Sequence, residues 1–333
     1  MQNLALNKQK IIPALIISCL GLVFYMPALA NSQDLFSQPF LRQIQAINNP
    51  QGQHQVTIAI IDEGIDFTQT DLSNSDAGQG WNFLLNDNNL APQGSHGTQV
   101  AGVILAASQN DSNIKLMNLI ACNERQGCNL DAINRAIYYA ADHGAQVINL
   151  SFTVTGKQGY RDEFSSAITY AYSRNLVIVA AAGNGDSKLR AINLDLHPIS
   201  PVCNDGAQNM VLGVSATDGD GRPAPWSNFG SCVDVSAPGS DIYTTVSPFY
   251  NHGSAYGYKE GTSYAAPIAA TLAAEIFSIN NTLTARQVMD KIISHASPLQ
   301  FAGYGSGLVN FSATLSTVGG LSQVSIIKPP LKQ

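Results

Sequence analysis

The sequence has few charged residues and no cluster of basic ones. Only 12% of its 333 residues are Asp, Glu, Lys or Arg, whereas 45% are hydrophobic, and the formal net charge is −6. The lack of a basic run argues against nucleic-acid binding, and the high apolar content argues against disorder. Internal repeats and low-complexity segments are also absent. What remains is a compact chain that can form one large domain with a sizeable core.

The N-terminal 30 residues have the pattern of a secretory signal peptide. Lys8 and Lys10 precede an apolar run at 11–26, and Ala28-Leu29-Ala30 fits the small-x-small cleavage rule. We therefore expect the mature chain to start at Asn31.

Two alternatives compete with a cleaved signal. A permanent membrane anchor is disfavoured because the run is short and ends at Pro27. Lipid attachment at Cys19 is disfavoured because the apolar run continues well past it. We expect an exported protein, extracellular or periplasmic, with no membrane span once the signal is removed.

Cysteine is scarce, and four cysteines remain after the signal. In an exported protein an even number indicates disulfides, although free buried thiols are the alternative. Three pairings are open, among which Cys122–Cys128 closes a small loop and Cys203–Cys232 a longer one. A zinc site is disfavoured, since no histidine lies at ligand spacing from them.

The middle of the chain alternates short β-branched runs with amphipathic helical segments. This alternation predicts parallel βαβ units and an α/β fold, a doubly wound, mostly parallel sheet in three layers. The expected strands are 56–61, 115–120, 147–151, 176–182, 211–215 and 233–236, and the expected helices are 130–143, 163–174 and 284–297.

One serine stands where a glycine bend enters a helix. The stretch 259–270, K-E-G-T-S-Y-A-A-P-I-A-A, places Ser263 between Gly261-Thr262 and an alanine-rich segment. Taken alone, Ser263 is best interpreted as a helix N-cap. A second interpretation is a nucleophile at a helix N-terminus, where negative charge is favoured.

Two further residues favour the second interpretation. Asp62 ends the predicted strand at 56–61, and His96 follows a bend and opens a small-residue helix. Serine becomes nucleophilic when a base takes its proton, and the base needs a carboxylate to fix its tautomer. The stretches D-E-G-I-D, S-H-G-T-Q-V-A-G, A-A-A-G-N and G-T-S-Y-A-A-P resemble, in this order, the subtilisin-like serine proteases. The resemblance covers about residues 40–315.

The resemblance implies a role for each matched residue. Asp62, His96 and Ser263 would form the catalytic triad, and Asn184 would donate to the oxyanion. The implied substrate-binding residues are Leu150, Ser151 and Phe152, which pair with an extended peptide, and Ala181, Ala182 and Gly183, which line the primary specificity pocket. The family also supports the Cys203–Cys232 pairing.

The implied function is a secreted serine endopeptidase that works through an acyl-enzyme. A catalytically silent peptide-binding protein on the same scaffold is the alternative, and an esterase or lipase is a weaker one, since G-x-S-x-G is absent around Ser263. We expect protein or peptide substrates, no nucleic-acid partner and a monomer.

Several secondary expectations follow. Residues 31–318 would form the peptidase domain and 319–333 a tail, which leaves no room for the folding-assisting propeptide of many members. No cofactor is required for the chemistry. Asp71 matches a calcium ligand of some members, so we leave open whether the protein binds a structural calcium ion. Glu63 has two interpretations, a residue that perturbs His96 and one that faces solvent, and we favour the second. We expect the insert 186–201 to reshape the specificity pocket.

Overall fold

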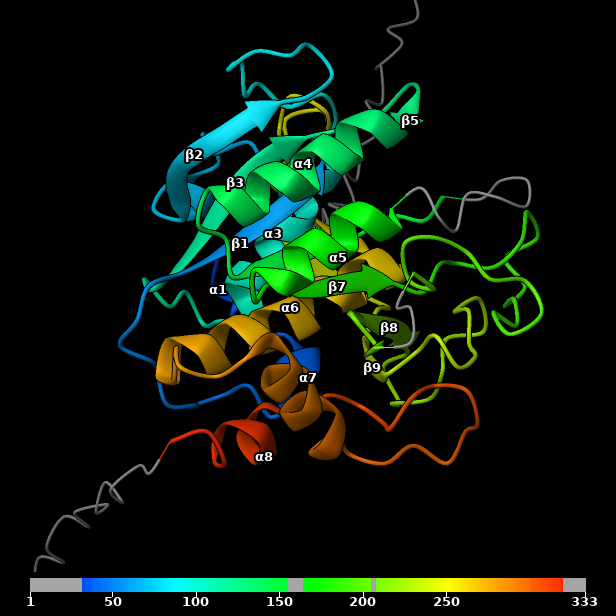
Figure 1. Ribbon diagram of the computed structural model, residues 1–333. Helices are drawn as coiled ribbons and strands as arrows, with labels where there is room; N and C mark the ends of the chain where they lie inside the picture. Colours follow the sequence, from blue (N-terminus) through cyan, green and yellow to red (C-terminus); the bar gives the residue numbers. More distant parts are fainter. Residues whose placement is uncertain (1–31, 155–163, 205–207, 320–333) are drawn as a thin grey trace, which may run out of the picture.

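The computed structural model describes residues 32–154, 164–204 and 208–319 (Figure 1). The predicted signal peptide and most of the predicted tail therefore lie outside the described residues. Within the described part, no helix has the length and apolarity needed to cross a membrane.

A seven-stranded parallel sheet forms the centre of the molecule, in the order β2-β3-β1-β6-β7-β8-β9. Its strands are β1 (Val56–Asp62), β2 (Asp76–Asn82), β3 (Ile114–Ile120), β6 (Val147–Leu150), β7 (Val177–Ala181), β8 (Val211–Thr217) and β9 (Val235–Pro238). The six predicted strands are all present, and the predicted α/β fold is confirmed. The edge strand β2 was missed, because D-A-G-Q-G-W-N has no apolar run.

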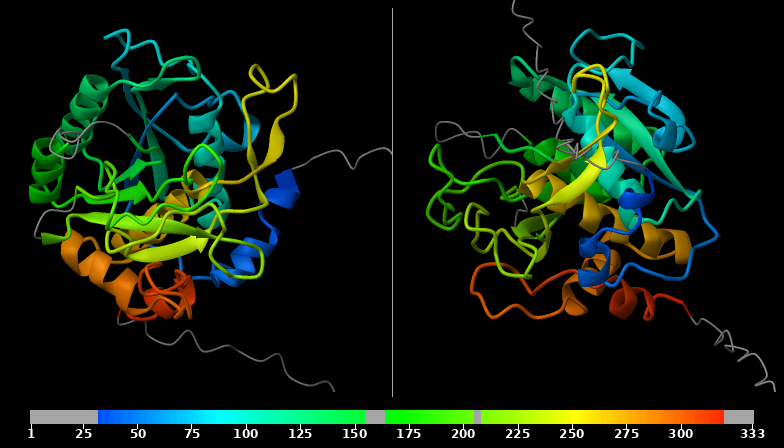
Figure 2. Two further views of the ribbon diagram at one scale, coloured as in Figure 1. Left: turned by 90° about the vertical axis from the view of Figure 1, so that its right-hand side faces the viewer. Right: turned by 180° about the vertical axis from the view of Figure 1, so that it is seen from behind.

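Helices cover both faces of this sheet. They are α1 (Ser32–Leu35), α2 (Pro39–Gln43), α3 (His96–Ala107), α4 (Leu130–Asp142), α5 (Ser165–Ser173), α6 (Thr262–Ile279), α7 (Ala285–Ser294) and α8 (Phe311–Leu315), with a 3-10 turn at Thr70–Leu72. Helices α4 and α5 pack together on one face, whereas α3 and α6 pack together on the other (Figures 1 and 2). The helices predicted by their residue ranges correspond to α4, α5 and α7, and those expected to begin near His96 and Ser263 are α3 and α6.

Alternate side chains of each strand supply the two cores. On β1, Ile58 and Ile60 pack towards α3 and α6, and Ala59 and Ile61 pack towards α4. All four are at most 1% exposed. Because both faces are buried, the strand reads as a continuous apolar run, which is why the sequence predicts it well.

Two small hairpins lie outside the main sheet. One pairs β4 (Cys122–Asn123) with β5 (Gly127–Cys128), and the other pairs β10 (Ile242–Thr245) with β11 (Tyr256–Lys259). The β10–β11 hairpin projects from the body of the molecule (Figure 2) and leads directly into α6. Neither hairpin was predicted.

Glu275 is a buried acid in the C-terminal part of α6. It is 7% exposed, and its Oε2 has no hydrogen-bond partner among the described residues. Burial raises the pKa of Glu275 well above its ordinary value, and the nearby Asp111 raises it further. The folded protein therefore holds this carboxyl protonated at a pH where the unfolded chain ionises it.

Glu275 should make the protein less stable as the pH rises. Below the ordinary glutamate pKa both states are protonated and nothing is lost; above it, ionisation favours the unfolded chain. We expect Glu275→Gln to raise the free energy of unfolding by roughly 1–3 kcal/mol near neutral pH and to leave it unchanged near pH 4. Urea unfolding at the two pH values measures this, with the exposed Glu260→Gln as control. An equal change in the free energy of unfolding at both pH values would contradict the raised pKa of Glu275.

Candidate active site

Three of the predicted site residues lie at the carboxyl ends of neighbouring strands. Asp62 ends β1, Ser151 follows β6, and Asn184 follows β7 after Ala182-Gly183. Strand β1 pairs with β3 on one side and β6 on the other. Crevices at the carboxyl ends of strands, where the strand order reverses, are common ligand sites in such sheets.

Asp62 and His96 are in direct contact. The His96 Nδ1 lies 3.0 Å from Asp62 Oδ1 and 2.9 Å from Oδ2. Asp62 is 2% exposed, whereas the His96 side chain is 29% exposed. A close approach of two backbones makes this possible, because a Cβ on Gly97 would lie 2.4 Å from the Gly64 carbonyl oxygen. Glycine at 97 thus lets α3 begin next to the turn that follows β1.

The surrounding charges favour the protonated imidazole. Burial lowers the pKa of His96, but the charge and hydrogen bond of Asp62 and the charge of Glu63 outweigh it, so the pKa is raised. Lys259 acts in the opposite direction. The carboxylate of Asp62 accepts at Nδ1, and we therefore assign the neutral-state proton to Nδ1. Nε2 is then left with the lone pair that a general base needs.

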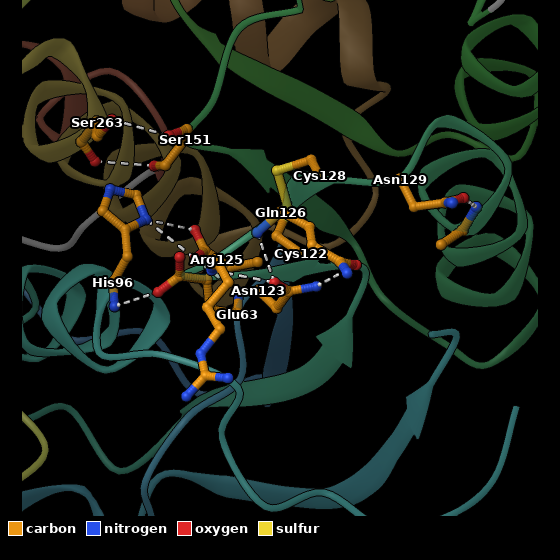
Figure 3. The surroundings of a disulfide bond; sticks show 12 residues. Glu63, His96, Cys122, Asn123, Arg125, Gln126, Cys128, Asn129, Ser151 and Ser263 are labelled. Carbon is orange, nitrogen blue, oxygen red and sulfur yellow. Dashed lines mark hydrogen bonds and ion pairs between the residues drawn. A yellow bond between two sulfur atoms is a disulfide. The ribbon is translucent and has the colours of Figure 1, made fainter. Parts of the chain in front are cut away.

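Ser263 occupies the first turn of α6. The N-cap of this helix is Gly261, with φ +145°, so Ser263 is not the N-cap. Its hydroxyl donates to the Ser151 carbonyl at 2.8 Å, and the Ser151 hydroxyl donates to the Ser263 carbonyl at 2.8 Å. Figure 3 shows this pair close to His96.

The structure thus joins Asp62 to His96 but gives Ser263 a different partner. Among the hydrogen bonds of the described residues, none connects the Ser263 hydroxyl with His96. Staggered rotamers of a serine side chain differ by a rotation of about 120° about χ1. The hydroxyl can therefore be redirected by one side-chain rotation without movement of the helix.

Asn184 is fixed in one orientation by its neighbour at the start of α6. Its Oδ1 accepts from the Thr262 N–H and from the Thr262 hydroxyl, both at 2.8 Å. The amide nitrogen Nδ2 remains as a donor, and it lies 3.1 Å from where a Cβ of Gly261 would stand. A larger residue at 261 would press on this amide. The arrangement leaves an N–H donor beside the N-terminus of the helix that carries Ser263.

The segments predicted to bind substrate flank these residues. Leu150, Ala181, Ala182 and Gly183 are buried, and Phe152 is partly exposed. A Cβ on Gly183 would lie 3.1 Å from side-chain atoms of both Thr153 and Ile199. Ile199 belongs to the insert 186–201, so that insert does reach the wall predicted for the specificity pocket.

The expectation that Glu63 faces solvent is wrong. Its Oε2 accepts from the backbone N–H of His96 at 3.0 Å. Room for this carboxylate comes from Gly94, since a Cβ there would lie 2.0 Å from Oε2. The motif places Glu63 beside Asp62 in sequence, but the return of the chain at 94–96 could not be inferred from it.

The four cysteines form two disulfides, each between cysteines that are consecutive in the sequence. Cys122–Cys128 joins β4 to β5, and Cys203–Cys232 spans 29 residues. Disulfide formation is therefore confirmed, and the open connectivity is decided in favour of these two pairs. The first bridge lies in the neighbourhood of the site (Figure 3).

Asp71 has a partner within the protein. Its Oδ2 accepts from the Tyr256 hydroxyl at 2.5 Å. In the described part of the chain, no group of three or more His, Cys, Asp or Glu side chains is arranged to hold a metal ion. Calcium binding at Asp71 stays a prediction that the geometry neither requires nor tests.

Comparison with known proteins identifies relatives of this arrangement. The model of the Subtilase family, Peptidase_S8, matches residues 53–311. The thermophilic serine proteinase of Bacillus sp. (strain AK1) is 35% identical over 70% of this chain and 55% of its own length. Thermitase of Thermoactinomyces vulgaris is 32% identical over 71% of this chain and 81% of its own length.

Solved structures share the fold. The crystal structure of a lanthipeptide protease superposes with a TM-score of 0.74 at 23% identity, covering 86% of this chain and 94% of that one. The chain spans about half the length of the Bacillus sp. (strain AK1) relative, so similarity covers the region of the site rather than that whole protein.

Proposed function

The chain belongs to the subtilase family, and on that premise we propose that it is a secreted serine endopeptidase. The observation that carries the proposal is the contact of His96 Nδ1 with both oxygens of the buried Asp62, which prepares Nε2 to act as a base. Ser263 stands nearby at a helix N-terminus, where developing negative charge is favoured.

The proposed reaction proceeds through an acyl-enzyme. The Ser263 hydroxyl rotates from the Ser151 carbonyl to His96, which takes its proton as Oγ attacks the peptide carbonyl carbon. Asp62 stabilises the imidazolium. His96 then protonates the leaving amine, and a water molecule, deprotonated by the same imidazole, releases the second product.

The charge that develops on the substrate carbonyl needs donors. Asn184 Nδ2 is one, because Thr262 occupies its Oδ1, and the backbone N–H of Ser263 is the other. Such preorganised donors stabilise the transition state more than the ground state.

Substrate would bind as an extended strand. We propose that residues 150–152, which continue from β6, pair with the peptide backbone. We propose that Ala181, Ala182 and Gly183 border the pocket for the residue before the scissile bond, and that this residue is bulky and apolar. Ile199, from the insert at 186–201, packs close to Gly183 and would form part of the same wall.

Export is part of the proposal. Two disulfides support folding in an oxidising compartment. The signal-like pattern of residues 1–30 supports the same route.

A fluorophosphonate probe tests the proposed activity, since only an activated serine reacts rapidly with it. We expect labelling of the peptide that contains Ser263, none in a Ser263→Ala variant, and cleavage of a peptide library with sites that report the preference before the scissile bond. A folded protein that binds peptides, takes no label and cleaves nothing would instead be the silent binding protein. Cleavage of short-chain esters without peptides would favour an esterase.

A further inference from the structure

Glu63 touches both residues of the Asp62–His96 pair. Its backbone N–H donates to Asp62 Oδ1 at 2.7 Å, and its side-chain Oε2 accepts from the His96 N–H at 3.0 Å. Glu63 therefore hydrogen-bonds to the Asp62 oxygen that also accepts from the imidazole, and to the backbone N–H of His96. Figure 3 shows Glu63 directly beside His96.

The helix that carries His96 depends on this contact at its first turn. His96 is the first residue of α3, and the N-cap residue Ser95 makes no side-chain capping bond. The first N–H groups of a helix need acceptors from outside it, and carboxylates are favoured there. Glu63 supplies such an acceptor from the strand side, 33 residues earlier in the chain.

The position of Glu63 is itself held in place. The Gln93 N–H donates to the Glu63 carbonyl at 2.6 Å, and the Glu124 N–H donates to the Gln93 carbonyl at 3.1 Å. Gly94 provides the space for the carboxylate, because any side chain there would collide with it. The Cys122–Cys128 bridge closes the turn from which Glu124 comes.

We propose that Glu63 is a positioning residue for His96: its carboxylate fixes the start of the helix that carries the imidazole and adds a second negative charge next to Asp62. This inference rests on the proposed peptidase function, since it assigns His96 the role of base. It concerns a residue that the four family motifs leave without a role.

The charges around the pair set the expected direction of the pH effect. Asp62, Glu63 and Lys259 face His96, with the first two raising its pKa and Lys259 lowering it. Burial raises the pKa of Glu63 itself, the His96 N–H lowers it, and Asp62 and Glu124 raise it. The phenols of Tyr250 and Tyr264 also lie within the field of Glu63, and Arg125 within that of Tyr250.

Two substitutions separate the two parts of the role. Glu63→Gln keeps an oxygen that can accept from the His96 N–H but removes the charge. We expect the acidic limb of the pH profile of kcat/KM to move to lower pH, because this limb reports the His96 pKa of the free enzyme. The plateau value of kcat should stay within about threefold of wild type.

Glu63→Ala removes both the charge and the acceptor. We expect the same displacement of the limb together with a plateau kcat about 3- to 10-fold lower and little change in KM, as for the loss of a helix cap that orients a catalytic group. The matched control is Glu124→Gln, which removes an exposed acid from the same neighbourhood. The acidic limb of the pH profile of kcat/KM should move less in Glu124→Gln than in Glu63→Gln.

A titration that does not depend on activity distinguishes this inference from the proposed function. NMR of ¹³C-labelled histidine follows His96 in a Ser263→Ala background, with its signal identified by its loss in His96→Ala. A lower His96 pKa in Glu63→Gln supports the inference even if the wild type takes no fluorophosphonate label. An unchanged pKa in Glu63→Gln, or a displacement no larger than in Glu124→Gln, overturns it while leaving the peptidase proposal intact.

Discussion

Replacing Asp62 by asparagine is expected to lower kcat by about four orders of magnitude, the size of loss seen for this change in enzymes with a Ser-His-Asp triad. Asparagine offers an NH₂ group where Asp62 now accepts from His96 Nδ1 with both oxygens. The imidazole would then carry its proton on Nε2, and it could no longer take the proton of Ser263.

The neighbouring turn offers a matched control for this change. Asp66 lies in the turn that follows β1, where it accepts from Thr68 and Ser247 and has no hydrogen bond to His96. Asp66→Asn should change kcat by less than about tenfold. Steady-state kinetics on one peptide substrate, with circular dichroism to verify folding, measures both variants. If Asp62→Asn kept more than a few per cent of activity, Asp62 would not be the residue that fixes the tautomer of His96.

Replacing Asn184 by alanine is expected to lower kcat by roughly 10²–10³ with little effect on KM. That range was measured in subtilisin, a member of this family, and is carried over rather than derived from this site. The selective effect on kcat has a structural reason, because Nδ2 is the donor left after Thr262 occupies Oδ1. A donor aimed at charge that appears only in the transition state changes turnover more than binding.

Asn184→Asp distinguishes the lost donor from a disturbed helix start. Aspartate keeps acceptors for the Thr262 N–H and hydroxyl, so the first turn of α6 should keep its geometry. It replaces the donor with a negative charge, and we expect at least as large a loss as in Asn184→Ala. A nearly normal kcat in the aspartate variant would show that Asn184 acts only through Thr262.

The parts of the fold that the sequence predicted are those buried on both faces. Strand β7 consists of consecutive apolar residues, and β1 contains the apolar run 58–61. Thr284 caps α7 through a bond with Gln287, as its sequence position suggests. Strand β2 escaped prediction because its polar, glycine-containing sequence lies at the edge of the sheet, where packing demands little. The hairpin of β10 and β11 has no local sequence pattern that predicts it, and β10 packs against α3.

The candidate site shows a similar division. Motifs identify which residue types are present and at which ends of strands and helices they stand, and Asp62 and His96 do meet. The Ser263 hydroxyl rests on Ser151, a choice between rotamers that residue identity does not determine. Glu63 was misplaced because its partner is a backbone N–H, and every residue except proline has one.

The wide spacing of the site residues along the chain has a consequence for synthesis. The contacts that define the site join residues 34, 78 and 112 positions apart, from β1 through to α6. With Ser263 as the proposed nucleophile, a chain still attached to the ribosome lacks it until α6 has been made and has left the exit tunnel. A peptidase built in this way stays harmless to the translation machinery for most of its own production, whatever else later restrains it.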